Sequence, residues 1–189
     1  MPTPIGHALN ALLFYPARPQ SRLSNRSILL TLLFFSLLPD FDFLIGFAMG
    51  RPNQYHHHFT HSISFVVIAG LIGAIVAAKN SRARFGAFFV LWSAAGLSHL
   101  LLDWLALDTS APYGVPLLWP FSMRYFISPL PLFSDVTRAS ESGQFLSSLF
   151  SIHNGKTILI ELLLLGPIWA ALHLAKFIKR LKPKYPINE

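Results

Sequence analysis

Two shortages stand out in this sequence: it has no cysteine and little charge. Only 12% of its 189 residues are charged, about half of the share in an average soluble domain. Together with 53% hydrophobic residues and a mean hydropathy of +0.50, that shortage predicts a membrane protein. The lack of thiols excludes disulfides and thiolate metal ligands, so any bound metal must use imidazole, carboxylate, carbonyl or water ligands.

Several common catalytic signatures are also missing. The chain has no Gly-x-x-x-x-Gly-Lys-Ser/Thr phosphate loop, no Gly-x-Ser-x-Gly elbow and no His-Glu-x-x-His motif. These absences argue against a P-loop nucleotidase, a serine hydrolase of the α/β type and a standard zinc protease.

The positive charge flanks the apolar segments. The formal net charge is +7, and most basic residues form three clusters. They are Arg18, Arg22 and Arg26, then Lys79, Arg82 and Arg84, and finally Lys176, Lys179, Arg180, Lys182 and Lys184. This pattern follows the positive-inside rule. We therefore expect the clusters and the C-terminus on the cytoplasmic side of the inner membrane, residues 51–61 and 108–156 on the other side, and no nucleic-acid partner.

The apolar segments predict an all-α, polytopic membrane helix bundle that forms a single integral membrane domain over residues 1–189. A short apolar helix is expected within residues 2–17. Membrane helices are expected at 28–38, resuming at 43–49, and at 63–78, 85–107 and 157–175. Residues 108–156 are predicted to form an extramembrane rim, and residues 176–189 a basic cytoplasmic tail. The bundle has five membrane helices if residues 2–17 cross the membrane, and four if they lie in the interface.

Half of the eight histidines stand within six residues, at His56, His57, His58 and His61. Neutral imidazole is the commonest protein metal ligand, so the cluster indicates a metal site. The alternative is a polar interfacial loop between two apolar helices. The rest of the chain has to decide between these two interpretations.

Two more groups of ionisable residues interrupt apolar segments. His99 and Asp103 are four residues apart and share one helix face, so they can bind one metal, or two with the carboxylate bridging. The alternative is a buried polar pair that holds helices together. Asp40 and Asp42 follow Pro39, whose helix break would let both face one cavity. One would then be a ligand and the other would orient a histidine or act as general base; the alternative is a helix-terminating loop.

These groups are predicted to lie at a similar depth in the membrane. Asp40 is 14 residues after Arg26, His99 is 15 after Arg84, and His61 is 18 before Lys79. At about 1.5 Å per residue they lie roughly 21 to 27 Å from the inner boundary of a core about 30 Å thick. His7, which is 11 residues before Arg18, joins them if its segment also crosses. Because each ionisable residue is costly in lipid, we expect one metal site near the outer leaflet.

A set of short motifs extends this pattern. They are Gly6-His7, Leu38-Pro39-Asp40-Phe41-Asp42, His56-x-x-Phe59-Thr60-His61-Ser62, Ser98-His99-Leu100-Leu101-Leu102-Asp103, and the segment Tyr113-Gly114-Val115-Pro116 with Leu117-Leu118-Trp119-Pro120-Phe121-Ser122. In this order and spacing they resemble the YdjM-like family of predicted membrane-bound, metal-dependent hydrolases, over residues 1–127. The family's histidine loop usually reads His-Arg-Gly-x-Thr-His-Ser. His57 and His58 therefore depart from it and are expected to be surface neighbours only, while His56 and His61 match.

The arrangement is more distantly similar to zinc-dependent phospholipase C. That resemblance implies the ligands His7, Asp40 or Asp42, His56 or His61, His99 and Asp103, with Asp103 as a bridging group. It also implies one to three divalent ions, zinc first and manganese or magnesium as alternatives. Fold-level analogy of this kind does not establish a reaction.

We therefore predict a membrane-embedded hydrolase that cleaves a phosphoester of a lipid-like or phosphorylated substrate with metal-activated water. Asp40 and Asp42 are the candidate catalytic residues. Arg124, in the rim segment 113–125, is expected to bind a phosphate or carboxylate of the substrate; the alternative is a contact with lipid headgroups. Other functions are a non-catalytic metal carrier or sensor and a purely structural polar core. So many ionisable residues converging in lipid argue against the last.

Overall fold

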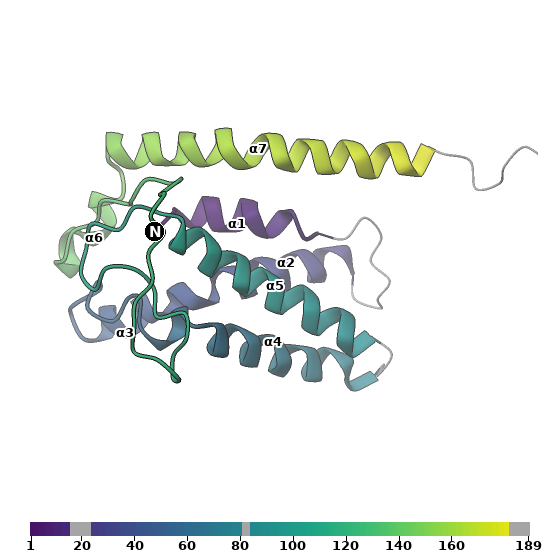
Figure 1. Cartoon of the computed structure of the whole chain (residues 1–189), viewed down its shortest axis with the longest axis horizontal. Coiled ribbons are helices and arrows are strands. Elements are labelled where there is room, and N and C mark those ends of the chain that lie inside the picture. Colours follow the sequence, from purple (N-terminus) through teal and green to yellow (C-terminus); the bar gives the residue numbers. More distant parts are fainter. Residues whose placement is uncertain (16–23, 81–83, 182–189) are drawn as a thin grey trace, which may run out of the picture.

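A computed structural model describes residues 1–15, 24–80 and 84–181 of the chain. Its main elements are helices α1 (Pro4–Leu12), α2 (Asn25–Leu37), α3 (Asp42–Ala48), α4 (Ile63–Ala77), α5 (Phe85–Trp104), α6 (Ser142–Ser148) and α7 (Ile152–Leu181). Three short 3-10 helices, η1 (Leu38–Phe41), η2 (Phe59–His61) and η3 (Ala78–Asn80), join them. In the described part of the chain, β structure is limited to two isolated bridges. Figure 1 shows the long helices lying side by side, with α7 along one side next to α1.

Local sequence signals explain where these helices begin. The Thr3 hydroxyl accepts a hydrogen bond from Gly6 N at 3.2 Å, and Pro4 occupies the first turn of α1. The hydroxyls of Ser24 and Ser62 cap α2 and α4 in the same way, each at 3.1 Å. The cap at Ser62 also sets the direction in which the histidine loop enters the bundle.

The predicted break at Pro39 is present as a 3-10 helix. Proline lacks a backbone N–H, so the α-helical ladder of α2 cannot continue through it unchanged. The chain tightens into η1 and resumes as α3 at Asp42. This tight turn places Asp40 and Asp42 at the same end of the bundle, two residues apart.

The core lies between α2, α4 and α5. Trp92 stacks on Phe35 and Phe88, with ring centroids 5.0 and 5.1 Å apart. Small residues allow α4 and α5 to approach closely: a Cβ added to Gly70 would overlap Ser93. Close packing of this kind is typical of membrane helices, because lipid itself supplies no hydrophobic force between them.

Helix α7 is longer than the sequence predicts. It begins at Ile152, five residues before the predicted start, and continues to Leu181, so the first part of the predicted tail is helical. Residues 182–189 of that tail lie outside the described residues. Most of the apolar side chains of α7 are exposed, as expected for a lipid-facing helix. Glu161 of α7 is fully buried. It accepts hydrogen bonds from the backbone N–H of Thr3, at 2.6 Å, and from the Thr3 hydroxyl.

The lengths of the helices indicate how many of them can cross the membrane. Three helical segments, Asn25–Ala48, Phe85–Trp104 and Ile152–Ile178, are long and apolar enough to cross, and Ile63–Ala77 is a shorter apolar helix. The all-α membrane bundle is therefore confirmed. Helix α1 has nine residues and rises only about 14 Å, less than half of the hydrocarbon core. It does not supply a fifth crossing by itself, so the count of four fits the described helices better than five.

The two ends of the bundle differ in character. The start of α2, the end of α4, the start of α5 and the end of α7 gather at one end (Figure 1). These positions carry Arg26, Lys79, Arg84 and Lys176. At the opposite end, residues 105–151 form irregular loops and α6. The backbone N–H of Ile63 donates to Leu117 O at 3.0 Å, so these loops contact the start of α4.

Candidate metal centre

At the end of the bundle opposite the basic clusters, buried imidazoles and carboxylates meet. We call them the histidine–aspartate cluster: His7 from α1, Asp40 from η1, Asp42 from α3, His56 and His57 from the loop before η2, His61 from η2, and His99 and Asp103 from α5. All seven predicted metal ligands are therefore brought together. Asp40 has a side-chain exposure of 12%, and the other members are 3% exposed or less as residues.

Four side-chain atoms face one another at the centre of the cluster. Nε2 of His61 lies 3.3 Å from Nε2 of His99, and both nitrogens lie within 3.0 to 3.5 Å of Asp103 Oδ2. Asp40 Oδ1 is 3.5 and 3.6 Å from the same two nitrogens. Two nitrogens and two carboxylate oxygens thus converge on one point. A cation bound between them would stabilise this arrangement by attraction to the carboxylates.

The opposite ring nitrogens explain why these atoms present lone pairs. Nδ1 of His99 lies 2.7 Å from the carbonyl oxygen of Ser36, so it donates its hydrogen there. Nδ1 of His61 lies 3.2 Å from Asp42 Oδ2. A histidine that donates from one ring nitrogen to a carbonyl or carboxylate is oriented to bind a metal through the other.

His7 completes this side of the cluster. Its ring stacks on that of His99 with centroids 3.7 Å apart, and its Nε2 lies 3.4 Å from Asp103 Oδ1. Neither ring nitrogen has a hydrogen-bond partner among the described residues. The backbone carbonyl of His7 accepts from the Ser36 hydroxyl at 2.9 Å, which ties α1 to α2 beside the cluster.

Asp42 contacts histidines from the side. Its Oδ1 lies 3.1 Å from His56 Nδ1, and its Oδ2 accepts from the Thr60 hydroxyl at 3.0 Å, besides the contact with His61. Both oxygens are thus engaged with groups that surround the centre. Asp40 differs, because neither of its oxygens has a hydrogen-bond partner among the described residues.

The two histidines that depart from the family pattern, His57 and His58, differ in exposure. His58 is exposed, as expected for a surface neighbour, but His57 is 3% exposed. The expectation that His57 is also a surface residue is therefore wrong. Its backbone has a φ of 60°, and its Nδ1 lies 3.5 Å from Asp108 Oδ2. The loop turns this ring inward, next to His56, with centroids 4.1 Å apart.

The pKa values of the buried histidines in and after the loop shift in opposite directions. Burial lowers the pKa of His56 and His57, which keeps their imidazoles neutral and able to bind a metal. Although burial opposes it, hydrogen bonds to Asp40 and Asp42 raise the pKa of His61 to about 10, so a metal that binds through His61 Nε2 would displace a proton from this ring. The carboxylates therefore create a negative potential that attracts a cation to this point.

The residues present fit a divalent metal. Buried polar atoms are normally hydrogen-bonded, yet His7 Nδ1 and Nε2, Asp40 Oδ1 and Oδ2, His56 Nε2, His57 Nε2 and both Asp103 oxygens have no partner among the described residues. Three groups have ligand atoms within 4.8 Å of one another: His7, Asp40 and His99; His61, His99 and Asp103; and His56, His57 and His61. Imidazole with carboxylate is a ligand set that suits zinc and manganese.

The two arginines of the rim, Arg124 and Arg138, have different surroundings. Arg124 is exposed, and its backbone N–H bonds the Ser122 hydroxyl. It does not line the cavity that borders the cluster. Arg138, which the sequence analysis did not single out, lines it instead. Arg138 is the one Lys or Arg between Arg124 and Lys156. Its isolation in a segment with few charges is the sequence feature that singles it out.

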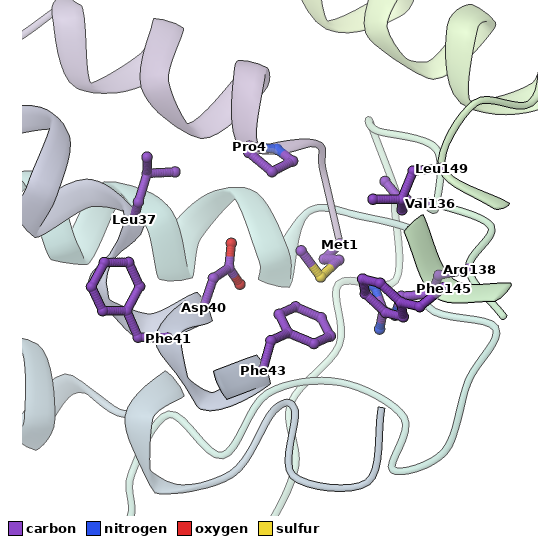
Figure 2. Close-up of a pocket in the computed structure, with 10 residues that line it drawn as sticks. All are labelled: Met1, Pro4, Leu37, Asp40, Phe41, Phe43, Val136, Arg138, Phe145 and Leu149. Atoms are coloured by element: carbon purple, nitrogen blue, oxygen red, sulfur yellow. The ribbon is translucent and has the colours of Figure 1, made fainter. Parts of the chain in front are cut away.

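A cavity of about 290 Å³ opens beside Asp40. Its lining is mainly apolar and comes from the chain start, the α2–α3 region and the segment around α6, as Figure 2 shows. The residues are Met1, Pro4, Leu37, Asp40, Phe41, Phe43, Val136, Arg138, Phe145 and Leu149. Asp40 is thus the most exposed of the predicted ligands, and it lines this cavity.

Comparison with known proteins places the chain in a family. The sequence profile described as "YdjM inner membrane protein" matches residues 1–178. The chain belongs to this family. It is also 30% identical, over 131 residues, to the inner membrane protein YbcI of Escherichia coli strain K12, covering 68% of this chain and 73% of that protein. No solved structure matches the chain. The match extends the YdjM resemblance beyond residue 127, through the rim and most of α7.

Proposed function

We propose that this YdjM-family protein is a membrane-embedded, metal-dependent hydrolase that cleaves a phosphoester of a lipid-like substrate. One observation carries the proposal: Nε2 of His61, Nε2 of His99, Asp103 Oδ2 and Asp40 Oδ1 converge within 3.0 to 3.6 Å. Buried groups of this kind are costly in a membrane unless a cation binds among them.

The ligands divide into two neighbouring sets. His7, Asp40, His99 and Asp103 form one set, and His56 and His57 form the other set, in the loop, with His61 between them. Asp103 contacts His7 with one oxygen and His99 with the other, which suits a bridging carboxylate. Zinc is the metal that we propose, with manganese or magnesium as alternatives, and it would supply an activated water and a Lewis acid.

The two aspartates after Pro39 have separate roles in this proposal. Asp42 uses both oxygens to hold His56, His61 and Thr60, so it positions ligands. Asp40 has unpartnered oxygens and borders the cavity, so it is a ligand that can also accept a proton from an attacking water. This divides the catalytic pair into a residue that touches the reacting atoms and one that acts through histidines.

A second function, a divalent-metal carrier or sensor, is favoured by the near-complete burial of the cluster. Apart from Asp40, its members are 3% exposed or less. A transport pathway, however, would need polar groups along the bundle. Below the cluster, the core is made of apolar side chains such as Leu32, Phe35 and Trp92.

The experiment compares the purified wild-type protein with Asp103→Asn and with the control Asp135→Asn. Asp135 is a rim carboxylate that contacts Thr109 and His153, outside the cluster. We expect bound zinc and cleavage of phosphoester lipids in the wild type and the control, and loss of both in Asp103→Asn. Metal without turnover on a phosphoester panel would favour the carrier, and a wild type that binds no metal would refute both functions.

A further inference from the structure

Arg138 is a partly buried cation. Its Nε donates to Asn53 Oδ1 at 3.0 Å, and its Cζ lies 5.3 Å from the centre of the Phe43 ring. Over residues 1–15, 24–80 and 84–181, no carboxylate oxygen comes within the 4.0 Å of a salt bridge to its guanidinium. Partial removal of an unpaired charge from water has a free-energy cost, and an anionic ligand would offset that cost.

The rim holds this guanidinium in place from several directions. Asn53 accepts from Arg138 and also donates from Nδ2 to the carbonyl oxygen of Ala139 at 3.1 Å. Asn154 donates to Thr137 O, and its Oδ1 accepts from Thr137 N, both at 2.8 Å. The segment that carries Arg138 is therefore fastened to the loop after α3 and to the start of α7. A guanidinium held in this way can bind a planar or tetrahedral oxyanion in a fixed orientation.

The cavity next to Arg138 suits a single apolar chain. One wall consists of Leu37, Phe41 and Phe43, and the other of Val136, Phe145 and Leu149 (Figure 2). Its volume of about 290 Å³ is at the lower end of the range for small-molecule sites. It accommodates a segment of one chain and leaves no room for a second.

Arg138 and Asp40 both line this cavity, and they are its charged side chains. An anionic group bound by Arg138 would therefore lie in the same cavity as Asp40, the member of the histidine–aspartate cluster that lines it. The chain attached to that group then lies against the aromatic and aliphatic walls. Charge and shape together define the ligand more closely than either does alone.

We propose that the cavity binds an amphiphile with one apolar chain and a phosphate headgroup, with Arg138 holding the phosphate and the apolar walls holding the chain. The proposal deepens the proposed function and depends on it for the reaction, but not for binding. A phosphate that carries one apolar chain can come from linear alkyl lipids or from branched isoprenoid lipids. The shared chemistry, a phosphate on a single chain, is what the site recognises.

The test measures equilibrium binding of decylphosphonate, which has no phosphoester bond to cleave, to the full chain in phosphatidylcholine nanodiscs, with and without added zinc. Empty nanodiscs give the partitioning background. We expect saturable binding at least about tenfold tighter than that of methylphosphonate, which has no chain, and no saturable binding of decyltrimethylammonium, which has the opposite charge. Geranylphosphonate, compared with decylphosphonate, distinguishes the isoprenoid from the linear source.

Substitutions identify the binding groups. We expect Arg138→Gln to weaken decylphosphonate binding about tenfold or more, and Arg138→Lys to recover part of it. Leu149→Trp, which fills the cavity, should weaken decylphosphonate but leave methylphosphonate unchanged. The control Arg51→Gln removes an exposed arginine that contacts Gln54 and should change neither ligand by more than about twofold. Zinc content equal to that of the wild type verifies that each variant is folded.

Several results would overturn the inference. They are equal affinity for decyl- and methylphosphonate, unchanged binding in Arg138→Gln, or a loss in Arg124→Gln that Arg138→Gln does not show. If Arg138→Gln loses its zinc, Leu149→Trp and the chain comparison decide the question. Turnover that does not depend on Arg138 or Leu149 would leave the hydrolase standing and refute the site. Binding that depends on Arg138 without any turnover would support the site and refute the hydrolase.

Discussion

At the scale of single residues, neighbouring side chains of the same type have different environments. Asp40 and Asp42 are two residues apart, yet Asp40 has unpartnered oxygens beside a cavity and Asp42 is bonded on both oxygens. His57 and His58 are adjacent, yet one is buried and the other exposed. The sequence identified both pairs but assigned no separate roles, because the roles depend on what the folded chain places next to each atom.

Substitution of Asp42 tests its positioning role. We expect Asp42→Asn to lower zinc affinity about 10- to 100-fold, because residues that orient metal-bound histidines contribute on that scale. Asp103→Asn, which alters a proposed ligand directly, should lose more. Competition with a chelator of known affinity measures both. Equal losses in the two variants would show that Asp42 is itself a ligand.

His57 tests whether the loop adds a second metal position. We expect His57→Ala to reduce the zinc bound per chain, since its buried Nε2 has no other partner among the described residues. His58→Ala is the matched control, because His58 is exposed and contacts the backbone carbonyl of Gln54. Elemental analysis of the purified proteins gives the metal count. An unchanged count in His57→Ala would assign this histidine to its contact with Asp108 alone.

At the scale of the elements, helix packing determines where the site residues meet. His99 and Asp103 were predicted to act together because their spacing within one helix is independent of the rest of the fold. The stacking of His7 on His99 depends instead on α1 lying against α5, at a separation of 92 residues. The predicted depths were consistent with this meeting but could not specify it, because depth along the membrane normal says nothing about rotation around a helix axis.

The close approach of α4 and α5 is tested at Gly70. A side chain there would overlap Ser93, whereas Gly86 has no heavy atom within 4 Å of an added Cβ. We expect Gly70→Leu to reduce stability by about 1–3 kcal/mol or more through overpacking, and Gly86→Leu to change it by less than about 1 kcal/mol. Unfolding in sodium dodecyl sulfate followed by tryptophan fluorescence compares them. Equal stability of the two variants would contradict this packing.

At the scale of the whole molecule, the charge pattern and the site lie at opposite ends of the bundle. Four members of the three basic clusters, Arg26, Lys79, Arg84 and Lys176, lie at or near helix ends away from the histidine–aspartate cluster (Figure 1). By the positive-inside rule this arrangement predicts a cytoplasmic C-terminus and a site near the outer leaflet. A substrate would then reach Asp40 from the headgroup region.

The absence of cysteine makes this topology directly testable. We expect a membrane-impermeant maleimide to label Phe121→Cys in intact spheroplasts, because Phe121 is 89% exposed in the rim. Lys79→Cys, at the exposed turn after α4, should be labelled only after the membrane is permeabilised. The native chain has no thiol to contribute background. Labelling of Lys79→Cys alone in intact spheroplasts would invert the topology and place the site near the cytoplasm.

The sequence by itself determined the class of this protein and predicted most of the residues that meet in the histidine–aspartate cluster. Low charge and long apolar runs require a membrane bundle, and ionisable residues in those runs are too costly to be accidental. Both properties are local and can be read from composition and spacing. The tertiary structure alone decided that His57 turns inward, that Asp42 holds histidines while Asp40 faces the cavity, and that Arg138 rather than Arg124 lines it. Such assignments depend on which loops fold over the end of the bundle, and contacts like that of Asn53 with Arg138 join residues 85 positions apart.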